Sequence, residues 1–350
     1  CSTTLVGRTA ASCARGQAAF DAALGFMVEH EAITLEEANA ARACLTTAQD
    51  IRTAGPFDLV IESIIEDLAI KQQLFRQLDE FLPPDTIISS DTSALRITDI
   101  AALMERPQRA VTTHFWNPAH LMPLVEVIQG EKTGEDTVQR AYHFLKRCGK
   151  RPVIGRKDVP GQLCNRLQQA VMREAIYMVQ TGIASAEDVE TCVKAGMGIR
   201  FPVYGPLEHL DAIGLDLGIA VQATVLPSLC NATEPLPLLK ELVAAGHLGA
   251  KTGRGFYNWQ ERSVSQLRLE RDLFLVERMK ATKRERQKRA PKEMPQAQEM
   301  LRKPRDGGHR RFAGLWRPAA GVPAPGSARE GHSHGGDHDG HRQPLLWAHP

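Results

Sequence analysis

The sequence predicts an α/β fold: a mostly parallel sheet covered by helices on both faces, followed by a helical region and a disordered tail. Three observations predict it. Strand-like runs alternate with helical patterns from about residue 16 to 157, which is typical of parallel sheets. Helical patterns dominate from about 158 to 279. From about 280 the chain turns basic and then rich in Pro, Gly and His, with too little apolar material to offset the entropy of ordering it.

Composition excludes several classes of protein. The chain has 350 residues and a net charge of +2, which suits one large or two modest domains. It has neither the roughly 18 apolar residues of a membrane helix nor the apolar stretch of a signal peptide at its start. Seven scattered cysteines without a Cys-x-x-Cys pair predict reduced thiols in the cytoplasm, with no disulfide framework and no metal site.

The first strands and helices can be placed from their apolar patterns. "FDLVIES" (57–63) is a buried strand, and "DTIISSDTS" (85–93) is a second, followed by a polar turn. Between them, "DLAIKQQLFRQLDEFL" (67–82) is an amphipathic helix that Pro83-Pro84 ends. Its predicted apolar side consists of Leu68, Leu74, Phe75, Leu78 and Phe81.

Two further strands and three helices follow. "RAVTTHF" (109–115) and "PLVEVI" (123–128) are strands, and "GEDTVQRAYHFLKRCG" (134–149) is a helix that ends on glycine. A long helix is predicted from Pro160 to Gly182, because proline favours a helix start and glycine a helix end. "SAEDVETCVKAG" (185–196) begins with a Ser cap and an acidic first turn.

One pair of residues stands out as a candidate for catalysis. His114 ends a strand just before an Asn-Pro turn, and strand ends in open α/β sheets are where ligands bind. Glu126 lies inside the next apolar strand, where a carboxylate needs a partner. A carboxylate on one imidazole nitrogen would leave the other free to take a proton from an alcohol. The alternative is a structural histidine at a turn and a glutamate that faces water at a sheet edge.

Further motifs favour the catalytic interpretation. Ser93 follows a strand end, Asn165 lies early in the long helix, and "GHLGAKTGRGFYNW" (246–259) holds a glycine-rich turn. In chain order the motifs are H-F-x-N-P, V-E-V, D-x-P-G-x-x-x-N-R, G-P-x-E and K-T-G-x-G-F-Y. From roughly Gly16 to Met279, the sequence thereby resembles the L-3-hydroxyacyl-CoA dehydrogenase family.

The resemblance implies a Rossmann-type cofactor domain, an all-helical domain that forms a homodimer, and NAD-dependent oxidation of a 3-hydroxyacyl-CoA, of the short-chain 3-hydroxybutyryl type in fatty acid metabolism. His114 matches the family's catalytic base and Glu126 the carboxylate that orients it. Ser93 and Asn165 match residues that hydrogen-bond the substrate. The residues that match NAD contacts are Glu66, Lys71, Ser93, Asn117 and Lys251.

Each matched residue also has a structural interpretation. Ser93 could cap the helix that begins near Ile97, and Asn165 could satisfy backbone at the domain joint. Lys71 could be a solvated helix lysine, and Asn117 before proline is a plain turn signal. "GAKTG" is not a phosphate loop, because Ala250 stands where that motif needs glycine.

The chain departs from the family at its start. The family's first strand leads into a G-x-G-x-x-G turn that seats the NAD pyrophosphate, and no such motif occurs in the 350 residues. We expect residues 1–14 not to replace this unit, so the Rossmann-type domain is incomplete and the native start is missing. The prediction that follows is that the chain binds dinucleotide weakly or not at all. NAD versus NADP stays open, as does the alternative of a non-catalytic fragment.

Other departures leave the substrate open. Asp91 stands where many members carry Asn, and His120 where an apolar residue is frequent. A CoA-free hydroxy acid or a related alcohol is therefore the alternative substrate. The predicted domains are 1–157 for the cofactor, 158–285 for substrate and dimerisation, and 286–350 as a disordered tail. We expect no nucleic acid or membrane partner. We interpret the basic, His-rich tail as a translated frameshift or a mispredicted terminus, and a basic nucleic-acid arm is the alternative.

Overall fold

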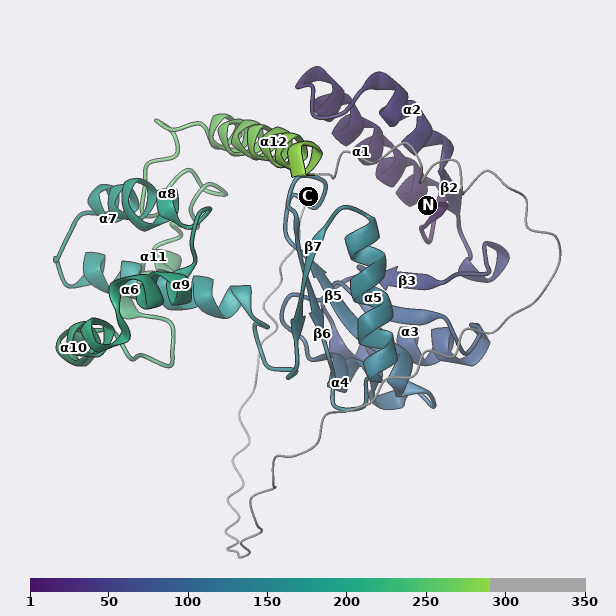
Figure 1. Ribbon diagram of the computed structural model, residues 1–350, viewed down its shortest axis with the longest axis horizontal. Helices are drawn as coiled ribbons and strands as arrows, with labels where there is room; N and C mark the ends of the chain where they lie inside the picture. The colour runs from purple at the N-terminus through teal and green to yellow at the C-terminus, as the bar shows by residue number, and fades with distance from the viewer. Residues whose placement is uncertain (290–350) are drawn as a thin grey trace, which may run out of the picture. The chain divides into compact units, whose positions relative to one another are not determined.

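The computed structural model describes residues 1–289 (Figure 1). Five strands form the main sheet in the order β3-β4-β5-β6-β7, and β1 and β2 form a separate parallel pair. Strands β3, β4 and β5 are parallel, β5 and β6 are antiparallel, and β6 and β7 are parallel. The strands are β1 (Thr3–Val6), β2 (Leu45–Ala48), β3 (Leu59–Glu62), β4 (Ile87–Ser90), β5 (Ala110–Phe115), β6 (Leu124–Ile128) and β7 (Arg151–Gly155).

The helices alternate with the strands in the first part and follow one another in the second. They are α1 (Ala10–Glu29), α2 (Leu35–Ala43), α3 (Leu68–Phe81), α4 (Ile97–Ile100), α5 (Glu135–Arg147), α6 (Cys164–Gln180), α7 (Ala186–Cys192), α8 (Gly198–Arg200), α9 (Pro206–Ile213), α10 (Leu215–Val225), α11 (Pro237–Ala244) and α12 (Val264–Arg289). The predicted α/β class with a mostly parallel sheet is confirmed, and the single antiparallel pair lies between β5 and β6.

Neighbouring residues of β4 show why both faces of the sheet are covered. Ile88 packs in one apolar cluster with Phe75 of α3, and Ile87 packs in another with Val138 of α5. Because successive side chains of a strand point to opposite faces, α3 and α5 cover opposite sides of the sheet. Figure 1 shows α5 lying alongside β5, β6 and β7.

Helix α3 begins where Asp67 caps it, its side chain accepting a hydrogen bond from the Ile70 N–H at 2.9 Å. The predicted helix is confirmed, but its buried face differs. Phe75 and Leu78 are buried as expected, whereas Leu68 and Phe81 are 36% and 39% exposed. The buried face also holds Lys71 and Asp79, and Leu68 and Phe81 are the first and last residues of the helix, where less of the protein covers them.

A strand at the start of the chain was not predicted. Residues Thr3–Val6 pair in parallel with β2, and α1 and α2 connect the two strands. Gly7 follows β1 directly, where an added Cβ would lie 2.5 Å from Ser12 Oγ of α1. Residues 1–14 therefore do contain a strand-to-helix connection, although not one with the G-x-G-x-x-G sequence.

The start of the long helix also differs from the prediction. Helix α6 begins at Cys164 instead of Pro160, because Gly161 and Gln162 have φ angles of +77° and +53°, which a right-handed helix cannot contain. Among the described residues, no single helix is long and apolar enough to cross a membrane, although the bent pair 206–213 and 215–228 would pass by length and composition together.

Contacts divide the chain into a unit of residues Cys1–Arg284 and a second unit, Glu285–Pro350. Of the second unit, only residues 285–289 are described, as the end of α12. Residues 286–289, predicted to be disordered, are therefore helical. The rest of the predicted tail, including the His-rich stretch at 332–341, lies outside the described residues.

Candidate active site

The pairing of β5 with β6 brings His114 and Glu126 together. The antiparallel register sets these two residues directly opposite each other, and His114 Nδ1 lies 2.8 Å from Glu126 Oε2. Glu126 is 0% exposed and His114 is buried beside it. This burial rules out the alternative in which the glutamate faces water at a sheet edge.

Glu126 is surrounded by hydrogen-bond donors. Its Oε2 also accepts from Trp116 Nε1 at 3.0 Å, while its Oε1 accepts from the backbone N–H groups of Leu163 and Cys164 at 2.9 and 2.8 Å. Burial alone would raise the pKa of Glu126, but the bonds from His114 and these donors outweigh burial and lower the pKa to about 2. The carboxylate is thus ionised at neutral pH.

The ionised carboxylate fixes the tautomer of His114. A carboxylate can only accept, so the proton of a neutral imidazole must lie on Nδ1, which leaves Nε2 as an acceptor. The hydroxyl of Ser93 lies 3.1 Å from Nε2. Because Nε2 is an acceptor, the Ser93 hydroxyl donates the hydrogen bond. The histidine nitrogen that faces the exposed Ser93 is therefore the basic one.

Ser93 and Asn165 belong to this site by position. Ser93 follows β4, and the Nδ2 of Asn165, in the first turn of α6, donates to the Ser93 carbonyl at 3.4 Å. Helix α4 begins at Ile97 as expected, but its cap residue is Arg96, and no side chain caps it. The interpretation of Ser93 as a helix cap is therefore wrong.

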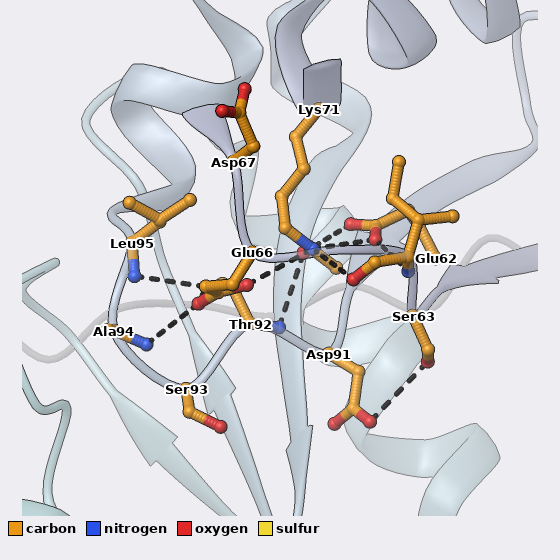
Figure 2. A network of polar contacts seen from close by, with 12 residues as sticks. Glu62, Ser63, Glu66, Asp67, Lys71, Asp91, Thr92, Ser93, Ala94 and Leu95 are labelled. Carbon is orange, nitrogen blue, oxygen red and sulfur yellow. Dashed lines mark hydrogen bonds and ion pairs between the residues drawn. The ribbon is translucent and has the colours of Figure 1, made fainter. Parts of the chain in front are cut away.

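Glu66 and Lys71 lie in a network of charges near the Ser93 loop, in which Lys71 is buried and the Glu66 side chain is 37% exposed. Lys71 is 1% exposed, and its Nζ contacts Glu62 Oε1 at 2.6 Å and Glu66 Oε2 at 3.3 Å. Figure 2 shows Lys71 reaching the carboxylates of Glu62 and Glu66. The alternative of a solvated helix lysine is thus wrong, whereas an NAD contact for either residue stays a prediction.

Asn117 and Lys251 lie on the surface. Asn117 is exposed in the connection from β5 to β6, directly before Pro118. Its predicted position in a turn is therefore correct, whether or not it also contacts NAD. Lys251 is exposed in the turn that the bridge between Gly249 and Arg254 closes. Their NAD contacts also stay predictions.

Several residues of the site were not predicted. Glu62 ends an apolar strand just as Glu126 interrupts one, and that shared signal could have identified it. Trp116 lies two residues after His114, a spacing that places strand side chains on the same face. Gln162, whose Nε2 donates to the Thr92 carbonyl at 2.7 Å, carries no such signal.

Asp91 connects two of the strands that carry the site. Its Oδ1 accepts a hydrogen bond from the backbone N–H of Phe115, next to His114, at 2.8 Å. Burial raises the pKa of Asp91, against the opposing effects of this hydrogen bond and of nearby His114. An amide oxygen could accept the same bond, so Asp at this position preserves the geometry that Asn would give.

Comparison with known families decides the identity of the chain. The family model for the 3-hydroxyacyl-CoA dehydrogenase NAD binding domain matches residues 1–159, and the model for the C-terminal domain matches residues 161–259. The chain belongs to the 3-hydroxyacyl-CoA dehydrogenase family. It is therefore an oxidoreductase, and its cofactor is NAD.

Two groups of relatives, distinguished by the activity in their names, are relevant to the substrate. A 5-formyl-3-hydroxy-2-methylpyridine 4-carboxylate 5-dehydrogenase of Mesorhizobium japonicum is 38% identical over 219 residues, covering 63% of this chain and 71% of the relative. A probable 3-hydroxybutyryl-CoA dehydrogenase of Bacillus subtilis is 40% identical over 220 residues, covering 63% and 75%.

Solved structures give the same two groups. The crystal structure of a 5-formyl-3-hydroxy-2-methylpyridine 4-carboxylic acid 5-dehydrogenase has a TM-score of 0.68 and 32% identity, covering 78% of this chain and 88% of its own. That of an (S)-3-hydroxybutyryl-CoA dehydrogenase from Ralstonia eutropha has a TM-score of 0.61 and 32% identity, covering 74% and 90%.

The described residues fit the nicotinamide end of NAD. The carboxyl ends of parallel β3, β4 and β5 meet at one edge, where ligands of open α/β sheets bind. His114 and the exposed Ser93 lie at this edge. For the pyrophosphate, folds of this type use a glycine-rich turn between strand and helix, and the 350 residues contain no G-x-G-x-x-G.

Proposed function

We propose that this protein oxidises the 3-hydroxyl of a short-chain L-3-hydroxyacyl-CoA to the ketone, with His114 as the general base. The observation that carries the proposal is the Glu126–His114–Ser93 line, with distances of 2.8 and 3.1 Å. Such a line presents a basic Nε2 to the strand edge where a substrate hydroxyl can bind. Family membership and the 3-hydroxybutyryl-CoA dehydrogenase relatives support the substrate class.

His114 has one task in this mechanism, to take the proton of the substrate alcohol on Nε2. NAD, when bound, would supply the acceptor for the hydride on the carbon that bears this hydroxyl. Loss of proton and hydride together leaves the C=O of the 3-keto product. The imidazolium that forms is stabilised by the buried carboxylate of Glu126, and in the reverse direction it returns the proton.

Ser93 and Asn165 would hold the substrate. The Ser93 hydroxyl already lies beside Nε2, so a substrate hydroxyl that enters here can bond to both groups. The Asn165 amide, on α6, lies close to Ser93 and donates to its carbonyl. Two polar groups on the reacting oxygen would keep it within proton-transfer distance of the base.

The test is reduction of acetoacetyl-CoA at millimolar NADH, followed by nicotinamide absorbance, in the full chain and in His114→Ala. We expect turnover in the full chain and a loss of about 10²- to 10⁴-fold in the variant, with an unchanged circular dichroism spectrum. Equal turnover in both proteins would refute His114 as the base.

A second candidate substrate is a formyl pyridine carboxylate. It is favoured by the relative and the solved structure that carry this activity in their names, at 38% and 32% identity. The same site would serve the hydrate of the aldehyde, because the chemistry is again removal of a proton from a hydroxyl group and of a hydride from the carbon that bears it. The ratio of kcat/KM for 3-hydroxybutyryl-CoA to that for the pyridine aldehyde separates the two candidates.

We propose a homodimer through the helical region. Helices α6, α9 and α11 bury none of their residues within the described chain. Large apolar side chains are exposed on these helices and on α10, including Leu167, Leu207, Leu217, Ile219 and Val243. An exposed apolar surface of this kind is usually buried against a partner chain. Sedimentation equilibrium should give twice the chain mass of 38.6 kDa.

A further inference from the structure

The loop after β4 is held by one carboxylate on both sides of Ser93. Glu66 Oε1 accepts a hydrogen bond from Thr92 Oγ1 at 2.5 Å and from the Ala94 N–H at 3.2 Å. Thr92 and Ala94 are the two neighbours of Ser93 in the chain. Figure 2 shows Glu66 beside this loop, with Ser93 at the turn between the two contacts.

The loop is also stiffened from within. Thr92 Oγ1, which donates to Glu66, accepts from the Leu95 N–H at 3.0 Å. A single carboxylate oxygen therefore orders the backbone from Thr92 to Leu95. The Ser93 hydroxyl lies between these two anchored neighbours, at 3.1 Å from His114 Nε2.

Lys71 and Glu62 hold Glu66 itself. The buried Lys71 ammonium lies between the two carboxylates, and Glu62 Oε2 accepts from Ser90 Oγ at 2.6 Å at the end of β4. A buried ammonium with two partners has little freedom, because leaving either carboxylate would cost it a charge-assisted bond. Burial would raise the pKa of Glu66, but Thr92, Lys71 and Ala94 outweigh it and lower that pKa, so the clamp is ionised at neutral pH.

We propose that Glu66 is a positioning residue for the reaction, which places Ser93 against His114 by clamping residues 92–94. The proposal rests on the proposed function, in which Ser93 and His114 contact the substrate. It gives Glu66 a role that acts through the serine, whereas the family resemblance implies a direct contact with NAD. Lys71 then serves as the buried counter-charge of the clamp.

The change Glu66→Gln is the appropriate test, because its outcome can be worked out from the contacts. Lys71 will retain the amide oxygen as its partner, so the NH₂ group turns to the loop. The Thr92 hydroxyl can accept from NH₂, but the Ala94 N–H then faces another donor and loses its bond. The Nε2 of Gln162 still donates to the Thr92 carbonyl at 2.7 Å. We therefore expect the loop to shift only locally, while the protein still folds.

The experiment is a cycle of four proteins: the full chain, Glu66→Gln, Ser93→Ala and the double variant. We expect Glu66→Gln to lower kcat about tenfold and to leave the KM for NADH within about twofold. In the Ser93→Ala background, the same change should alter kcat by less than about twofold. Equal loss in both backgrounds, or an effect confined to the KM for NADH, would overturn the proposal.

A readout without turnover completes the test. In the chain free of cofactor, amide hydrogen exchange at Ala94 should accelerate in Glu66→Gln, and the ¹⁵N signal of His114 Nε2 should move. The matched control is Glu80→Gln near the end of α3, the helix that carries Lys71, and its partner is the exposed Arg76; it should change neither. Unchanged exchange and ¹⁵N signals in Glu66→Gln would refute the clamp. Full activity of His114→Ala would instead refute the proposed function.

Discussion

Replacing Glu126 with glutamine gives the most direct measure of what the buried carboxylate contributes. The folded protein lowers the pKa of this group from 4.5 to about 2. At about 1.4 kcal/mol for each tenfold change in proton affinity, the fold favours the carboxylate over its protonated form by about 3 kcal/mol. Glutamine has the shape of the protonated form, so we expect Glu126→Gln to lower the free energy of unfolding at pH 7 by about 3 kcal/mol.

The contacts give the same magnitude by a different argument. Each oxygen of Glu126 accepts two N–H donors, and the amide NH₂ must replace one oxygen. Two buried donors then face a third donor, and each unsatisfied group costs about 1–3 kcal/mol. Activity should fall with stability, by about 10²- to 10⁴-fold in kcat, because glutamine cannot stabilise the imidazolium.

The sign of the pH dependence provides the sharpest check. A lowered pKa contributes stability that is complete above the unfolded value of 4.5 and is lost as the pH falls through about 2. Urea unfolding of both proteins at pH 7 and pH 3 should therefore show a difference that shrinks with acid. Glu80→Gln, at a side chain that is 63% exposed, is the matched control and should change little. A difference below about 1 kcal/mol at pH 7, or one that is equal at both pH values, would refute the reasoning.

Three other predictions follow from the described contacts. Asp91→Asn should leave unfolding at pH 8 unchanged or shift it to higher urea, because burial raises the pKa of Asp91 and the amide oxygen can still accept from Phe115; a clear loss of stability would contradict this. Arg109→Met should lower the free energy of unfolding by about 1.5–3 kcal/mol, since it removes from the buried Asp79 the guanidinium that lies 2.7 Å away and leaves that of Arg106 at 3.2 Å, and urea unfolding with Arg76→Met as the control measures it. Titration of the 350-residue chain with NADH, followed by nicotinamide fluorescence, should show weak binding, because the sequence has no glycine-rich turn for the pyrophosphate; saturation at micromolar NADH would show this prediction wrong.

The pairing of His114 with Glu126 could be predicted from the sequence. A charged residue inside an apolar strand has to find a partner, and the neighbouring strand offered one. Periodicity was enough for the long elements, because α3, α5, β5 and β6 carry strong apolar patterns. The cytoplasmic location and the division into domains remain predictions.

Weak patterns explain the elements that were missed. Strand β1 has four residues and only two apolar side chains, and β7 contains Arg151 and Pro152, which are unusual in a central strand. Strand β7 lies at the edge of the sheet, and there proline is tolerated. Whether such a segment forms a strand depends on its position in the sheet. A short window of the sequence carries no information about that position.

The sequence by itself determined the fold class, the family motifs and the residues that can perform the chemistry. The tertiary structure alone decided how they are held: that Lys71 is a buried counter-charge, and that Glu126 accepts from the backbone of Leu163 and Cys164. The physical reason is that backbone N–H groups are the same in every residue, so only their position in space makes them donors to a particular carboxylate. Positive φ angles at Gly161 and Gln162, just before α6, create that position, and they too result from the packed chain.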